Sequence, residues 1–154
     1  MRSQKKEYQK WQEWIEIIYF DLQEQSKFQR MFKHYIQKYD ELTAFVSKCY
    51  FIQTAMAIRR QLGTQKDEIS LMKLLQQLHK AQSMFYLHNI PTNDIQDDIQ
   101  KLIEIENRIG LYVDRKIAHL DRRKFDQACT LEDLNYSLKI LNTIVAKYFK
   151  CLTH

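Results

Sequence analysis

The chain has 154 residues, of which 45% are hydrophobic and 28% charged, and its formal net charge is +5. This length fits one globular domain that buries enough surface to fold without a metal ion or a disulfide. Two glycines and one proline are too few for the tight turns of an all-β fold, which favours long helices joined by few turns.

Apolar residues first recur at helical spacing at Trp11, Ile15, Ile18 and Leu22, with Trp14 and Ile17 widening the stripe. A second set follows between residues 28 and 39, after a possible break near Ser26. The pattern predicts one long helix or two consecutive helices. We interpret residues 1–40 as an N-terminal helical extension and residues 41–154 as the core bundle of the same single domain, 1–154.

Residues 41–62 are apolar around most of the helical circumference, so we predict a central helix that is the most buried of the chain. Gly63 suits a C-terminal cap. Arg59 and Arg60 would then lie in the last turn, where cations interact favourably with the helix dipole.

Three more helices are predicted after Gly63. Asp67 or Ser70 can begin the first, residues 87–93 form the clearest loop, and the second begins near Asp94. The stripe of this second helix continues through Val113 to Ile117, and Gly110 weakens the helix by about 1 kcal/mol relative to alanine. After a polar loop over residues 121–129, Thr130 and Asp133 resemble a capping box at the start of the last helix. These elements predict an all-α bundle of five or six helices.

The cysteines Cys49, Cys129 and Cys151 are odd in number and match no metal-binding spacing, which predicts reduced thiols and a cytoplasmic protein. The N-terminus lacks the apolar core of a signal peptide, and no apolar run is long enough to span a membrane. The chain has no glycine-rich phosphate loop and no HExxH or Glu-x-x-His pair. We therefore predict no cofactor and no metal site.

Two short segments hold all of the excess positive charge. Residues 1–10 and residues 114–124 each carry a net charge of +3, and the rest of the chain carries −1. Such local concentration predicts an anionic partner such as RNA, although solvated basic segments are an equally good interpretation.

The second basic segment contains Arg115 and His119, which share one face if the segment is helical. In a metal-independent nuclease, His119 could transfer a proton and Arg115 could stabilise the charge of the transition state. Asp121 could orient His119. The other cations of the segment could hold backbone phosphates: Lys116, Arg122, Arg123 and Lys124. A histidine that packs at the end of an amphipathic helix is the simpler alternative.

Residues 54–62 (TAMAIRRQL) and 69–75 (ISLMKLL) resemble the middle of bacterial HEPN-like domains of the abortive-infection AbiU type. Residues 114–123 (DRKIAHLDRR) and 130–134 (TLEDL) resemble the C-terminal half of the same domains. The resemblance covers roughly residues 40–150, in matching order and separation.

This resemblance implies an all-α, HEPN-like fold that pairs as a homodimer, and a metal-independent ribonuclease used in phage defence as an abortive-infection or toxin–antitoxin effector. It assigns the catalytic roles to His119 and Arg115, and it implies RNA and an antitoxin or other protein as partners. The usual signature places four to six residues between arginine and histidine, whereas three separate them here. This spacing favours the alternative of a non-catalytic dimerisation or partner-binding module.

Two questions stay open at this point. Arg59 and Arg60 belong to the resemblance, yet we expect a structural role in which they pair with Asp114 or Asp121 across the bundle. A third possible function is nucleotide binding, supported by stacking on Tyr112, Phe125 and Tyr136.

Overall fold

The structure, a computed structural model, describes residues 2–36, 40–81, 92–110, 112–113 and 129–153. Over these ranges the chain forms five α-helices and one π-helical turn and contains no strand, so the predicted all-α bundle is confirmed. Residues 87–91 of the predicted loop and the whole basic segment 114–124 lie outside the described residues, and α4 (Thr92–Ile105) begins inside the loop predicted over 87–93.

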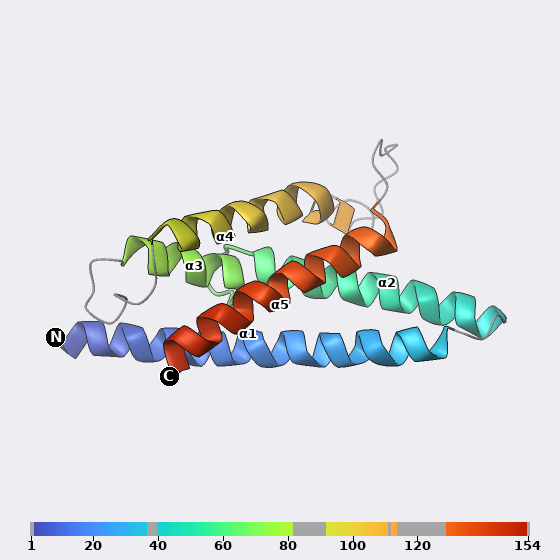
Figure 1. The fold of residues 1–154 in the computed structure, drawn as a ribbon, viewed down its shortest axis with the longest axis horizontal. Coiled ribbons are helices and arrows are strands. Elements are labelled where there is room, and N and C mark those ends of the chain that lie inside the picture. Colours follow the sequence, from blue (N-terminus) through green and yellow to red (C-terminus); the bar gives the residue numbers. More distant parts are fainter. Residues whose placement is uncertain (1, 37–39, 82–91, 111, 114–128, 154) are drawn as a thin grey trace.

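The five helices form two layers around one apolar core. Figure 1 shows α1 (Arg2–Tyr35) along one edge, with α2 (Glu41–Leu62) returning beside it and α5 (Leu131–Thr153) crossing them obliquely. On the other side lie α3 (Leu71–Lys80), α4 (Thr92–Ile105) and the π-helical turn η2 (Glu106–Gly110). None of the described helices is long and apolar enough to cross a membrane.

The N-terminal region forms one continuous helix, α1, with no break at Ser26. The Ser26 hydroxyl instead accepts a hydrogen bond from Asn142 Nδ2 of α5 at 3.0 Å. The first predicted stripe is buried in the common core: Trp11, Ile15, Ile18 and Leu22. Including Ile17 in that stripe was wrong, because its side chain is 53% exposed on the opposite side of the helix.

The bounds predicted for α2 are confirmed, and Arg59 and Arg60 lie in its last turn. The prediction that α2 is the most buried helix is wrong for its N-terminal half, where Leu42 is 57% and Phe45 is 64% exposed. In Figure 1 this half extends past the start of α5, so fewer elements cover it.

Gly63 does cap α2, but with a φ of −63° and not in the left-handed conformation. Its lack of a side chain matters for another reason. The Glu68 carboxylate occupies the space that a Cβ atom would need at Gly63. The same carboxylate accepts a hydrogen bond from the Gln65 backbone N–H at 2.8 Å, so glycine permits a tight turn before α3.

Of the two residues proposed to begin α3, Ser70 and not Asp67 is the N-cap, and the capping box predicted at Thr130 is confirmed. Ser70 caps α3 and accepts a hydrogen bond from the Lys73 N–H at 3.1 Å. At the start of α5, Thr130 Oγ1 accepts from the Asp133 N–H at 3.1 Å, while Asp133 Oδ2 accepts from the Thr130 N–H at 2.9 Å. This reciprocal capping box fixes where α5 begins.

Between α4 and α5, the helical hydrogen-bonding pattern changes at η2. Gly110 ends this turn and packs against Glu106, whose Oε1 atom would lie only 2.8 Å from a Cβ at position 110. The weak point predicted at Gly110 thus coincides with a change of helix type. The apolar stripe predicted for α5 began at Leu131, and this first position was wrong because Leu131 is 36% exposed. The other positions of the stripe are buried: Leu134, Leu138, Leu141, Val145, Tyr148 and Leu152.

Candidate functional site

The residues predicted for catalysis and RNA binding lie outside the described residues, as do the two aspartates predicted to orient or support them: Arg115, Lys116, His119, Arg122, Arg123 and Lys124, with Asp114 and Asp121. The shared Arg115–His119 face therefore stays a prediction. Phe125 also lies in this segment, and Tyr112 is half-buried with its ring edge-on to Phe51, 6.0 Å between centroids.

Arg59 and Arg60 tie the end of α2 to two neighbouring elements. Arg60 Nη2 lies 2.9 Å from Asp21 Oδ1 of α1, and Gln61 Nε2 donates to the other Asp21 oxygen at 2.8 Å. Arg59 Nη1 lies 3.6 Å from Glu106 Oε1 of η2. These contacts give both arginines a structural role, while pairing with Asp114 or Asp121 stays a prediction.

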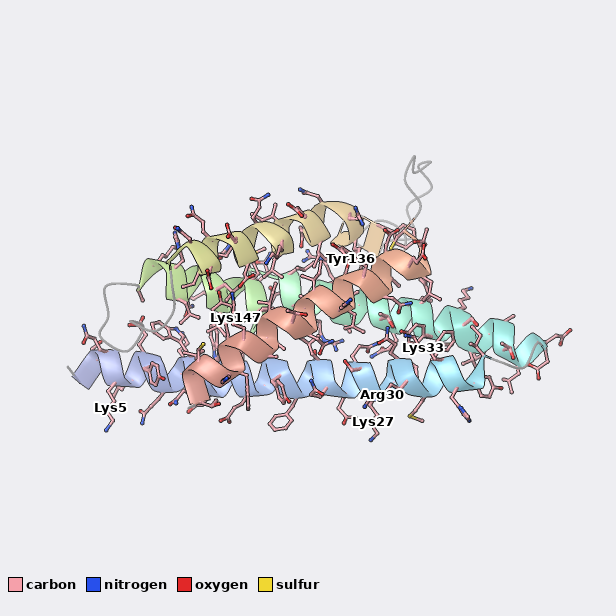
Figure 2. All side chains as sticks on the ribbon, viewed as in Figure 1. Lys5, Lys27, Arg30, Lys33, Tyr136 and Lys147 are labelled. Atoms are coloured by element: carbon pink, nitrogen blue, oxygen red, sulfur yellow. The ribbon has the colours of Figure 1, made fainter. Side chains whose placement is uncertain are left out.

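Two grooves flank the outer ridge of α5, and both include Tyr136, Lys139 and Thr143. Figure 2 shows Tyr136 and Lys147 along α5, with Lys33 on the facing part of α1. We call the groove between α1 and α5 the amide groove and the groove between α4 and α5 the charged groove. Tyr136 is 58% exposed, so its ring is open to a ligand on the ridge between them.

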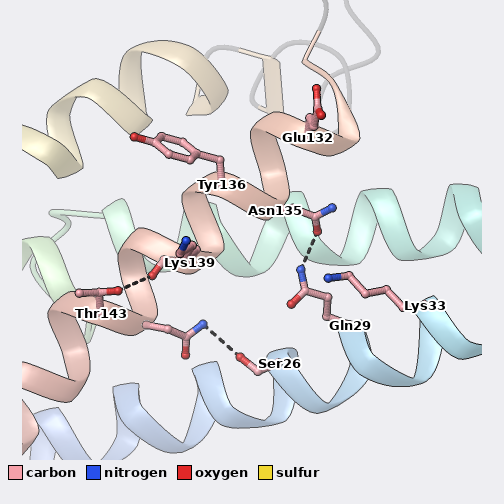
Figure 3. A pocket seen from close by; sticks show the side chains of 9 residues that line it. Ser26, Gln29, Lys33, Glu132, Asn135, Tyr136, Lys139 and Thr143 are labelled. Atoms are coloured by element: carbon pink, nitrogen blue, oxygen red, sulfur yellow. Dashed lines mark hydrogen bonds between the residues drawn. The ribbon is translucent and has the colours of Figure 1, made fainter.

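The amide groove encloses about 700 Å³ and is lined by Ser26, Gln29, Lys33, Glu132, Asn135, Tyr136, Lys139, Asn142 and Thr143. Figure 3 shows the Gln29 and Asn135 side chains meeting across the groove, where Gln29 Nε2 donates to Asn135 Oδ1 at 2.7 Å. Asn142 Nδ2 donates to Ser26 and to the Leu138 carbonyl oxygen, at 3.0 and 2.9 Å. Asn142 Oδ1 is shielded from solvent and accepts no hydrogen bond within the described part of the chain.

The chemistry of the amide groove suits a polar, weakly anionic ligand. Lys33 and Lys139 face a single carboxylate, Glu132, among the lining residues. Side-chain amides can donate and accept hydrogen bonds with the polar edge of a ligand, and an exposed tyrosine can stack on a planar ring. Among the described residues that line this groove, no nucleophile is paired with a base.

The charged groove encloses about 730 Å³ and includes the buried carboxylate Asp98, which is 2% exposed. Asp98 Oδ1 accepts from Lys101 Nζ at 3.0 Å and Oδ2 accepts from the Tyr148 hydroxyl at 3.1 Å. Lys147 Nζ pairs closely with the same Oδ2 and lies 3.8 Å from Asp94 Oδ2.

These contacts decide the protonation states in the cluster. Burial raises the pKa of Asp98, but the hydrogen bonds and charges of Lys147 and Lys101 outweigh it, so the pKa lies below its ordinary value. Burial and the neighbouring Asp98 charge raise the pKa of Tyr148. Asp98 is thus ionised and Tyr148 neutral near pH 7, an arrangement that holds α4 against α5.

The three cysteines are unpaired, as predicted: Cys49 and Cys151 are exposed and Cys129 is half-buried. Burial raises the pKa of the Cys129 thiol to about 11, so its reactive thiolate is scarce at neutral pH. Within the described ranges no group of three His, Cys, Asp or Glu side chains could hold a metal ion.

Sequence reasoning missed most of the groove residues and named only Tyr136. Gln29, Asn135 and Asn142 look like ordinary solvent-facing residues until α1 and α5 are set side by side. Asp98 carried a signal, because it falls in the stripe between Ile95 and Leu102 where an apolar residue is expected. Comparisons of this chain with protein-family models, curated proteins and solved structures give no match.

Proposed function

We propose that this chain is a helical interaction module that binds a partner protein along an exposed stripe of α2. The stripe consists of Leu42, Phe45, Cys49 and Ile52, and the observation that carries the proposal is their joint exposure at successive spacings of three, four and three residues. Single exposed apolar residues are ordinary, whereas a continuous stripe without a charge is typical of a binding surface. We refer to these four residues as the α2 stripe.

An amphipathic helix is the occupant that this stripe fits best. Residues spaced at three and four positions on one helix offer the knobs and holes that a second helix packs against. The N-terminal half of α2 extends past the start of α5, which leaves room beside the stripe (Figure 1). An antitoxin or another protein with such a helix is the class of partner that we propose.

Cys49, at the centre of the α2 stripe, provides a direct test. A maleimide photo-crosslinker is attached to Cys49 in a Cys151→Ser chain, and the matched control carries it on Cys151 in a Cys49→Ser chain. Both thiols are exposed, whereas Cys129 reacts slowly because of its raised pKa. The labelled chain is added to an extract of the native cells. We expect one protein to be crosslinked at Cys49 but not at Cys151. The crosslinked segment of that protein should have apolar residues at helical spacing.

Binding of the purified partner to wild-type and variant chains then tests the proposal. We expect Phe45→Glu to weaken its binding by about tenfold or more, since the substitution places a charge in the apolar contact. Equal crosslinking from both cysteines, or unchanged binding by Phe45→Glu, would contradict the proposed role of the α2 stripe.

The second candidate is an RNA-interacting effector of phage defence, with His119 and Arg115 as the catalytic pair of a metal-independent ribonuclease. The amide groove favours it, because Tyr136, Lys139 and Lys33 combine a stacking surface with two cations. The groove lies at the start of α5, which follows the basic segment 114–124 in the chain. Here the homodimer is the functional unit that the resemblance implies.

This candidate predicts that His119→Ala abolishes RNA cleavage in the presence of EDTA, a loss of about 10²–10⁴-fold, without unfolding the chain. Tyr136→Ala should weaken RNA binding by about tenfold through the loss of stacking on one base. His79→Asn is the control for a histidine substitution elsewhere and should retain cleavage. If the wild-type chain neither binds nor cleaves RNA, the interaction module stands as the only proposal.

A further inference from the structure

The outer side of α1 carries a second exposed apolar face, separate from the α2 stripe. Ile17, Phe20, Met31 and Tyr35 are 53%, 62%, 62% and 38% exposed. At 100° per residue their side chains leave the helix within about 60° of one another. Figure 2 shows Lys27 on this outer side of α1, away from the other helices.

Glu24 and Lys27 lie on this face between the two apolar pairs, and both are exposed. Neither makes an ion pair within the described part of the chain. Positions 17, 20, 24, 27, 31 and 34 follow the alternating three- and four-residue spacing of a helix–helix seam. We call these six positions, together with Tyr35, the α1 face.

The α1 face is complementary to itself when two copies run antiparallel. With a two-fold axis between residues 25 and 26, Phe20 of each copy meets Met31 of the other, and Glu24 meets Lys27. Ile17 then lies beside His34 and Tyr35. A parallel arrangement would instead bring Glu24 against Glu24 and Lys27 against Lys27, which costs free energy.

We propose that the α1 face binds the α1 face of a second copy of this chain in an antiparallel, two-fold pair. The symmetric charge pattern argues for a second copy over other occupants, because a two-fold interface must match its own surface. The inference goes beyond the proposed interaction module and does not depend on the binding of a partner protein at α2. It uses a surface distinct from the α2 stripe.

The pair should be in reversible equilibrium with the monomer. The seam from Ile17 to Tyr35 is about 27 Å long at 1.5 Å per residue, which is a small contact for an obligate dimer. Charged residues at two of its positions fix the register at some cost in stability. We therefore expect a dissociation constant on the order of micromolar.

Charge reversal tests both the involvement of the α1 face and the antiparallel orientation of the two helices. Lys27→Glu and Glu24→Lys should each raise the dissociation constant of the full-length chain by about tenfold or more in sedimentation equilibrium, because like charges then meet twice. An equimolar mixture of the two single variants should pair again, since every charged contact in that heterodimer is complementary. Lys150→Glu is the matched control, an exposed charge reversal on α5 and away from the α1 face, and should leave self-association unchanged.

Circular dichroism of each variant confirms that α1 remains helical. A wild-type chain that is monomeric at every concentration, or a dimer that neither single variant weakens, would overturn the inference. Single variants that weaken the dimer without restoring it on mixing would overturn the antiparallel register. These outcomes are independent of crosslinking at Cys49, so failure of the α1 face and failure of the α2 stripe can be told apart.

Discussion

Replacing Trp11 by alanine is expected to lower the free energy of unfolding by about 3–5 kcal/mol, because it removes the largest side chain of the core. Trp11 is fully buried in the common core of the bundle. Its indole Nε1 donates a hydrogen bond to Gln77 Oε1 of α3 at 3.0 Å, so the substitution also leaves that oxygen without its donor. For a chain of this length the loss corresponds to a decrease in Tm of roughly 10 °C.

Trp14 provides the matched control on the same helix. Its ring is half-buried and contacts two lysines, with Lys10 Nζ 4.4 Å and Lys73 Nζ 5.3 Å from the ring centroid. We expect Trp14→Ala to cost less than half as much as Trp11→Ala, measured by urea unfolding followed by circular dichroism. Equal losses would mean that α1 does not contribute to the core in the way that its burial implies.

The helices of this chain could be predicted because their apolar stripes and caps are local features. Thr130 and Asp133 define the start of α5 within four residues, and the stripe from Leu134 to Leu152 follows from helical geometry alone. Ser70 does the same for α3. In each case the residues that determine the structure are neighbours in the sequence.

The neighbours of each helix could not be predicted in the same way. The N-terminal half of α2 is as apolar as a core helix, but Phe45 is exposed because few other elements reach that end of the bundle. Apolar residues on a helix indicate that the surface is favoured to be buried, but they do not identify the helix or partner that covers it. Because the fold leaves the α2 stripe exposed, its apolar residues become evidence for a binding partner.

The grooves depend on the register between helices far apart in the sequence. Gln29 meets Asn135 across 106 positions, and Asp98 meets Tyr148 across 50. No local pattern fixes such pairs. The Arg115–His119 face depends only on local spacing and could be proposed from sequence, but it lies outside the residues that the structure describes.

The Asp98 cluster predicts a second large effect. Replacing Asp98 by alanine is expected to cost about 3 kcal/mol, because it leaves the Tyr148 hydroxyl buried without its acceptor and Lys147 without its closest anion. Asp98→Asn keeps the shape and an acceptor for Tyr148 but removes the charge. We therefore expect a smaller loss from Asp98→Asn at neutral pH.

Acid should abolish the difference between the wild-type chain and Asp98→Asn. The pKa of Asp98 is lowered in the folded state, so its charge stabilises the fold fully above the unfolded value of about 3.9. This contribution is lost as the pH falls through the lower, folded-state pKa. Urea unfolding of both proteins, from neutral pH down to about pH 2, measures the difference between their free energies of unfolding at each pH.

The comparison isolates Asp98 from the other carboxyl groups with lowered pKa. Asp133, whose pKa is lowered by its hydrogen bonds to Thr130, is present in both proteins, and so is Asp40 at the start of α2. Their effects cancel in the difference between the two unfolding free energies. A difference that stays constant down to the lowest pH would mean that the Asp98 charge does not stabilise the packing of α4 against α5, and that only the shape of the side chain matters.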